Sequence, residues 1–120
     1  MVVDSSVWIE IVCDGPLRKK CEEALKNTDP IVPTLVIYEI YRKLKKQTSE
    51  ETSLEVVSAL SKYKSMEINR DIALLAGDLS LEFDLGMADS MVLACARFSH
   101  AQLLTLDNDF ASVTGVKVIR

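Results

Sequence analysis

Residues 103–110 read LLTLDNDF, an apolar run followed by three consecutive side chains that carry oxygen. The run predicts a short buried strand over Gln102–Leu106, and Asp107 follows it directly. The chain opens in a similar way, because Met1–Asp4 is a short apolar run that ends in an aspartate. In an open parallel sheet, ligands bind beyond the carboxyl ends of the strands. We therefore expect Asp4 and Asp107 to lie along one edge of a shared sheet.

Helical and strand patterns alternate between these two stretches. Further strands are expected at Ile31-Val32, Met66–Ile68 and Val116–Ile119. Helices are expected over Val7–Val12, Leu17–Lys26, Leu35–Gln47, Thr48–Tyr63, Asn69–Gly86 and Ala88–Ser99, with a short helical turn over Asp109–Val113. Short apolar strands that alternate with helices predict an α/β fold, in which helices cover both faces of a parallel sheet. At 120 residues, without a linker or an internal repeat, the chain is expected to form one domain over residues 1–120.

Small polar residues and a glycine predict where several helices begin and end. Ser5 and Ser6 are expected to cap the first helix, and Thr34 the helix that starts at Leu35. Gly86 is expected to end the helix before it, because a glycine often lies just past the last helical residue.

The charge balance bears on the kind of partner. The chain has 18 acidic and 14 basic residues and a net charge of −4. Proteins that bind nucleic acids by charge attraction alone are usually basic, so composition by itself argues against such a partner. This objection weakens if several carboxylates hold divalent cations, because a bound metal reverses the local field.

Missing motifs exclude several other classes of protein. The three cysteines form no CxxC pair or Cys/His cluster, so a zinc site and a disulfide framework are not expected. An odd number of cysteines without a pairing pattern fits a reducing intracellular compartment. The sequence also has no signal-peptide pattern and no apolar stretch of membrane-spanning length, which favours a cytoplasmic protein without a membrane partner. Neither GxxxxGK[ST] nor GxGxxG is present, which argues against a nucleotide cofactor.

Two further carboxylates have positions that face the same sheet edge or a cleft. Asp89 opens a helix after the turn at Gly86, and the amino ends of such helices usually point to that edge. Glu39 lies opposite the expected apolar side of its helix, which consists of Ile37, Ile40, Tyr41 and Leu44. A helix with a second, partly apolar side can line a cleft.

Each carboxylate also has an ordinary structural explanation. Asp4 can cap the turn that follows it, and Asp89 can be the N-cap of its helix. Asp107 can form an Asx-turn with Asp109. Glu39 can form an ion pair with the lysine four residues later on an exposed helix face. Taken singly, none of these residues requires a catalytic role.

As a set, the carboxylates indicate a metal site. Mg²⁺ and Mn²⁺ prefer oxygen ligands in octahedral geometry. Three or four carboxylates held close together repel each other strongly unless cations lie between them. Two such ions about 4 Å apart can activate a water molecule and stabilise the leaving oxygen of a phosphodiester.

Basic residues follow Glu39 along its helix. Arg42, Lys43 and Lys46 could hold RNA phosphates next to the metals. An ordinary charged, solvated helix face explains the same residues equally well.

Four motifs together resemble those of PIN domains. They are MVVDSSVWIE with Asp4 and Ser6, PTLVIYEIYRKL with Glu39, GMADSMVLACA with Asp89, and LLTLDNDF with Thr105, Asp107, Asp109 and Phe110. The motifs occur in the family's order and span the whole chain. The resemblance implies a three-layer α/β/α sandwich with a central parallel sheet of four or five short strands. The compact form with LLTLDNDF is most similar to VapC-type toxins.

The resemblance also implies an activity and a set of roles. Active PIN domains are Mg²⁺- or Mn²⁺-dependent nucleases. VapC-type toxins cleave RNA, are held inactive by a partner antitoxin and are typically homodimers. The implied roles are metal coordination for Asp4, Glu39, Asp89, Asp107 and Asp109, catalysis for the first four of these, and orientation of carboxylates or water for Ser6 and Thr105.

Three functions are therefore compared. The first is a metal-dependent endoribonuclease that is the toxin of a type II toxin–antitoxin pair. The second is a PIN-fold module that binds RNA or protein without cutting, which the acidic net charge and the acidic flank at Glu82 and Asp84 leave open. The third is a receiver-like signalling domain. Such a domain needs adjacent acidic residues after its first strand, and here Asp4 is followed by two serines.

Overall fold

The computed structural model describes all 120 residues. The strands are β1 (Val2–Val3), β2 (Ile31–Pro33), β3 (Lys64–Met66), β4 (Leu103–Thr105) and β5 (Val116–Val118). They form one sheet in the order β3-β2-β1-β4-β5, and every neighbouring pair is parallel. The helices are α1 (Ser5–Val12), α2 (Arg18–Leu25), α3 (Thr34–Gln47), α4 (Glu50–Leu60), α5 (Arg70–Phe83) and α6 (Met87–Phe98), with a 3₁₀-helix η1 (Asn108–Phe110).

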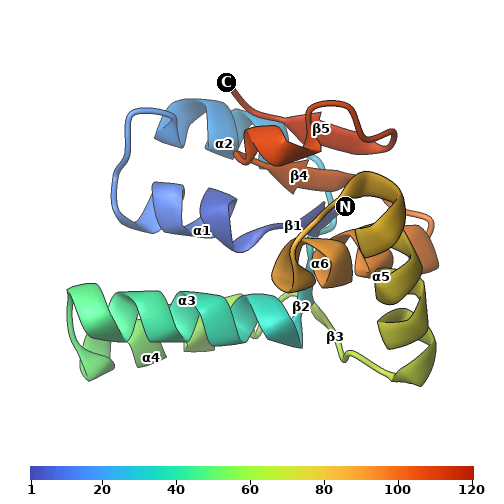
Figure 1. Ribbon diagram of the computed structural model, residues 1–120. Helices are drawn as coiled ribbons and strands as arrows, with labels where there is room; N and C mark the ends of the chain where they lie inside the picture. The colour runs from blue at the N-terminus through green and yellow to red at the C-terminus, as the bar shows by residue number, and fades with distance from the viewer.

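Six α-helices flank the sheet, so the predicted α/β/α sandwich with five short parallel strands is confirmed (Figure 1). The helices pack in pairs, α3 against α4 and α5 against α6. Val2 and Val3 of β1 and Leu103 and Leu104 of β4 have no exposed surface. Strands buried on both faces read as continuous apolar runs, which is why these two were recognisable. No helix combines the length and the apolar character needed to cross a membrane.

The strand order places a crevice at the end of β1. From β1 the chain moves outward through β2 and β3, and it then returns to the other side of β1 for β4 and β5. Ligands of doubly wound sheets bind at such a reversal, beyond the carboxyl ends of the strands. Val2 pairs with Leu103 and Val3 with Leu104. Asp4, the residue that follows β1, therefore lies beside Thr105, the last residue of β4.

Two helices begin differently from the expectation. Asp4, rather than the serine pair, is the N-cap of α1, and its side chain accepts a hydrogen bond from the backbone N–H of Ser5. Aspartate is as good an N-cap as serine, so the sequence alone did not separate them. Thr34 is the first residue of α3 and makes no capping bond, because β2 runs directly into the helix and Pro33 is the N-cap.

The end of α5 is also formed by a different residue. Asp84 has the left-handed backbone conformation, with φ at 54°, and its N–H donates to the carbonyl of Ser80. Aspartate is one of the few residues besides glycine that adopts this conformation readily. Gly86 has a φ of −65° and is instead the N-cap of α6. Asp89 is thus in the first turn of α6 and is not its N-cap.

The strand expected at Met66–Ile68 lies two residues earlier, at Lys64–Met66. This is an edge strand that pairs only with β2, and Lys64 and Ser65 are exposed. Its backbone hydrogen bonds, rather than buried apolar side chains, define it. The apolar pattern therefore misplaced its boundary.

The buried face of α3 is rotated from the expected one. Val36, Ile40 and Leu44 are fully buried, whereas Ile37 and Tyr41 are only partly covered. The rotation brings Glu39 to the border of the buried face, so that it is partly buried between the core and solvent.

Candidate metal centre

Asp4 is held rigidly at the carboxyl end of β1. Its side chain is only 7% exposed. Oδ1 accepts a hydrogen bond from the backbone N–H of Ser5 at 2.8 Å. Oδ2 accepts two more, from Thr105 Oγ1 at 2.8 Å and from Ser6 Oγ at 3.0 Å. Three donors from two separate parts of the chain therefore fix the orientation of this carboxylate.

The two hydroxyls that bind Asp4 also hold the loop after β4. The backbone N–H of Leu106 donates to Ser6 Oγ at 3.1 Å, and that of Asp107 donates to Thr105 Oγ1 at 3.0 Å. Each hydroxyl thus donates to one carboxylate and accepts from the backbone beside another. These hydrogen bonds link the position of Asp4 to that of Asp107.

Three aspartates gather at the end of β4. Asp107 is the N-cap of η1 and accepts a hydrogen bond from the N–H of Asp109 at 2.9 Å, the Asx-turn that its position predicts. Asp89 approaches from the first turn of α6. One carboxylate oxygen from each of these residues lies within 4.8 Å of the others. Asp4 and Glu39 are outside this trio.

Burial and, after it, the crowding of negative charge disfavour ionisation of Asp89. Burial, together with the charges of Asp107, Asp4 and Asp109, raises the pKa of Asp89 from 3.8 to about 6. Burial also raises the pKa of Glu39, and the charges of Asp4 and Asp89 act in the same direction, while a hydrogen bond from Ser5 opposes them. All five carboxylates therefore share one electrostatic environment.

Glu39 reaches this environment from α3. Its Oε1 accepts a hydrogen bond from Ser5 Oγ at 3.3 Å. The ion pair that i,i+4 spacing allows with Lys43 is not formed. Glu39 thus faces α1 and the sheet edge instead of its own helix surface.

The donor set fits a hard divalent cation. It offers only oxygen atoms. These belong to carboxylates on η1, on α6 and at the end of β4, and one oxygen of each lies close enough to the others to share a single cation. Mg²⁺ and Mn²⁺ favour such ligands, and a cation would remove the repulsion that raises the pKa of Asp89.

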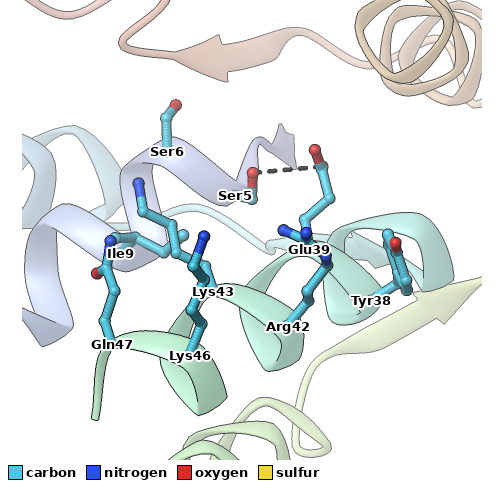
Figure 2. Close-up of a pocket in the computed structure, with 9 residues that line it drawn as sticks. All are labelled: Ser5, Ser6, Ile9, Tyr38, Glu39, Arg42, Lys43, Lys46 and Gln47. Carbon is cyan, nitrogen blue, oxygen red and sulfur yellow. Dashed lines mark hydrogen bonds between the residues drawn. The ribbon is translucent and has the colours of Figure 1, made fainter.

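A basic groove runs from this site between α1 and α3. Its volume is about 600 Å³. Figure 2 shows Ser5 on α1 opposite Glu39 on α3, with the cationic side chains farther along α3. The lining residues, which define the α1–α3 groove, are Ser5, Ser6, Ile9, Tyr38, Glu39, Arg42, Lys43, Lys46 and Gln47. The three basic residues expected to contact RNA therefore share one groove with Glu39.

A family model of the PIN domain matches residues 1–116. The chain belongs to the PIN domain family. This agrees with the four motifs and with the fold.

Solved structures similar to this PIN domain include VapC toxins. A chain of a toxin–antitoxin complex from Klebsiella pneumoniae is 25% identical, with a TM-score of 0.83 over 99% of this chain and 97% of that chain. A sarcin–ricin-loop-cleaving VapC toxin from Mycobacterium tuberculosis is 17% identical, with a TM-score of 0.81 over 99% of this chain and 98% of that one. A chain of a DNA-bound VapBC complex from Salmonella typhimurium is also 17% identical, with a TM-score of 0.78 and coverages of 98% and 94%. No curated protein sequence matches the chain.

Two residues of this PIN domain lie at the site without having been expected there from the sequence. Ser5 was expected only as a cap, yet its hydroxyl donates to Glu39. Tyr38 lines the groove beside Glu39. The sequence contains no periodic signal for Ser5, whereas an exposed tyrosine next to Glu39 and near three basic residues could have indicated Tyr38.

His100 lies at the carboxyl end of α6, where its backbone N–H donates to the carbonyl of Arg97.

Thr105→Val is expected to weaken metal binding at the candidate metal centre. Thr105 is fully buried, and valine keeps its shape but removes the hydroxyl that joins Asp4 to the N–H of Asp107. Unsatisfied buried polar groups cost about 1–3 kcal/mol each, so the free energy of unfolding should fall by a similar amount. Loss of a group that orients metal ligands typically lowers metal affinity about 10–100-fold.

The matched control is Thr105→Ser, which keeps the hydroxyl and loses only a methyl group. It should retain Mn²⁺ affinity measured by calorimetry, at a cost of about 1 kcal/mol in urea unfolding. Equal Mn²⁺ affinities for the valine variant and the wild type would contradict the orienting role of Thr105.

Proposed function

We propose that this PIN domain is a Mg²⁺- or Mn²⁺-dependent endoribonuclease and the toxin of a type II toxin–antitoxin pair. The observation that carries the proposal is the trio of Asp89, Asp107 and Asp109, whose carboxylate oxygens lie within 4.8 Å of each other at the switch point of the sheet. Membership of the PIN family and the likeness to VapC toxins support the reaction class.

The trio would hold a divalent cation, and Asp4 and Glu39 would complete the acidic wall around it. Once bound, the cation supplies Lewis-acid stabilisation of phosphate charge and lowers the pKa of water. Asp4 enters this arrangement already fixed by Ser5, Ser6 and Thr105.

The α1–α3 groove would bind the RNA backbone. Arg42, Lys43 and Lys46 line it and offer cationic groups to phosphates next to Glu39. This local basic surface offsets the acidic net charge of the chain, because RNA contacts the groove and not the average surface. Hydrolysis is expected to leave a 5′-phosphate and a 3′-hydroxyl.

The partners of the similar structures suggest partners for this chain. Two of those structures are toxin–antitoxin complexes from Klebsiella pneumoniae and Salmonella typhimurium. By analogy, a cognate antitoxin would inhibit this domain. The resemblance of the four motifs to VapC-type toxins further suggests a homodimer as the active form and a cytoplasmic location.

The test is RNA cleavage by the purified protein. A mixed RNA pool is incubated with Mg²⁺, with Mn²⁺ or with EDTA, using wild type, Glu39→Gln, and Glu55→Gln as a matched control at an exposed site on α4. The proposal expects metal-dependent cleavage by the wild type and by Glu55→Gln, and loss of at least about a hundredfold for Glu39→Gln. Cleavage in EDTA, or full activity of Glu39→Gln, would overturn it. A folded wild type that binds RNA but cuts with neither metal would indicate the non-cutting RNA-binding module.

A further inference from the structure

A row of three side chains separates two hollows on α3. Tyr38, Arg42 and Lys46 follow each other at intervals of four residues, so they lie along one side of the helix. All three line the α1–α3 groove. They also line a second hollow of about 470 Å³, together with Tyr41 and Lys45. A ligand that occupies the groove can therefore extend across this row into the second hollow.

Tyr38 is the aromatic residue of the row, and its side chain is free to contact a ligand. Its side chain is 60% exposed. It makes no side-chain hydrogen bond, and no aromatic or cationic group stacks on its ring. Tyr41 differs, since Lys45 lies over its ring and its hydroxyl is hydrogen-bonded to Lys45 and Glu50.

The neighbours of Tyr38 define what it can bind. Glu39 follows it directly, and its carboxylate points to Ser5 across the groove (Figure 2). Arg42 and Lys46 lie farther along the same row. An exposed ring thus lies next to Glu39 at one end of the row, and two cationic groups follow it along α3. This arrangement matches a single-stranded nucleic acid, in which bases stack on aromatic rings and phosphates contact basic side chains.

We propose that Tyr38 is a specificity-determining residue that stacks on an unpaired RNA base beside the cleaved phosphodiester, while Arg42 and Lys46 bind the adjoining phosphates. The inference rests on the proposed ribonuclease function. A base within a duplex has both faces covered by its neighbours, whereas an unpaired base has a face free for Tyr38. The ring therefore selects single-stranded RNA over duplex RNA and accepts any base, because every base has a π-face.

The experiment measures binding without cleavage. Fluorescence anisotropy in EDTA gives the affinities of the wild type, Tyr38→Ala and Tyr38→Phe for a labelled single-stranded RNA of mixed sequence and for the same sequence as a duplex. Tyr38→Ala should weaken single-strand binding about tenfold and leave duplex binding unchanged, and Tyr38→Phe should bind as the wild type does. Circular dichroism checks that each variant is folded, as the exposure of Tyr38 leads us to expect.

The salt dependence separates stacking from charge. Tyr38→Ala should shift the affinity without changing the slope of log K against log salt concentration. Arg42→Ala should reduce the magnitude of that slope by about 0.7, the value for one phosphate contact to a single strand. A stacking role and a charge role therefore give different signatures.

Several results would overturn the inference. They are unchanged single-strand affinity of Tyr38→Ala, an equal loss for Tyr38→Phe, an equal loss of duplex binding, and no RNA binding by the wild type. Unchanged RNA affinity combined with weaker capture of a protein partner would assign Tyr38 to a protein interface instead. If the wild type cleaves RNA but Tyr38→Ala binds it normally, only this inference fails. If Tyr38-dependent binding occurs in a folded protein that cuts with neither metal, only the ribonuclease proposal fails.

Discussion

Asp89→Asn is expected to abolish metal-dependent RNA cleavage and at the same time to raise the melting temperature of the metal-free protein at neutral pH. Asparagine has nearly the same shape as aspartate but carries no charge, so it removes one member of the trio without opening a cavity. Activity and Mn²⁺ affinity should fall by at least about a hundredfold, because even residues that only orient metal ligands contribute 10–100-fold. The gain in metal-free stability follows first from removal of a partly buried negative charge and then from relief of its repulsion with Asp107 and Asp4.

The pH dependence gives an independent check on Asp89. Its pKa is raised to about 6 in the folded protein from the ordinary 3.8. The folded state therefore holds this proton more tightly than the unfolded state does. The resulting stabilisation is complete below about pH 3.8 and is lost as the pH rises through about 6. Without metal, the advantage of Asp89→Asn over the wild type should thus grow between about pH 4 and pH 6 and level off at higher pH.

Metal binding should show the complementary trend. A proton on Asp89 competes with the cation, so Mn²⁺ affinity of the wild type should fall as the pH decreases below about 6. Melting temperatures with Mn²⁺ and with EDTA measure both effects. Asp78→Asn is the matched control, since Asp78 is an exposed aspartate on α5. A wild type and an Asp89→Asn variant with the same Mn²⁺-induced shift would exclude Asp89 as a ligand.

Phe110→Ala is expected to have the largest effect on stability. Phe110 is 1% exposed and is among the largest fully buried side chains. It ends η1, directly after Asp109, and its N–H donates to the carbonyl of Asp107. Truncation of a buried phenylalanine costs about 3–5 kcal/mol, against a total stability of about 5–15 kcal/mol for a domain of this kind. The ring therefore anchors the segment that carries two of the three trio carboxylates.

Two further variants keep this prediction testable. Phe110→Leu retains most of the apolar bulk, so it should fold and yet bind Mn²⁺ more weakly, because η1 is seated less firmly. Phe98→Ala removes the same ring from a site that is 47% exposed, and it should change urea unfolding by less than about 1 kcal/mol. Equal destabilisation by Phe98→Ala and Phe110→Ala would contradict the anchoring role.

Sequence patterns located the central strands better than the edges of elements. The apolar runs before Asp4 and Asp107 corresponded to β1 and β4, because strands buried on both faces must be apolar throughout. The edge strand β3 has no such requirement, and its boundary was misplaced. The carboxyl end of α5 was misplaced as well, since Asp84 adopts the conformation that glycine usually signals.

The grouping of the carboxylates was beyond the sequence patterns. The motifs predict that one group of four carboxylates acts together, namely Asp4, Glu39, Asp89 and Asp107. The structure brings Asp89, Asp107 and Asp109 within ligand distance of one another, and it engages Asp4 with hydroxyl groups. Which carboxylates meet depends on small differences in the positions of these side chains. Hydrogen bonds between residues far apart in the sequence, such as that from Thr105 to Asp4, set those positions.

By itself, the sequence determined the α/β class, the PIN family and the pairing of two aspartates with the ends of buried strands, because these depend on the order and local periodicity of residues along the chain. Only the tertiary structure decided which carboxylates meet, that Ser5 binds Glu39, and that Tyr38 shares a groove with Arg42 and Lys46. These features depend on strand order and on the rotation of α3 about its axis. Both are set by packing between segments far apart in sequence, which no local pattern encodes.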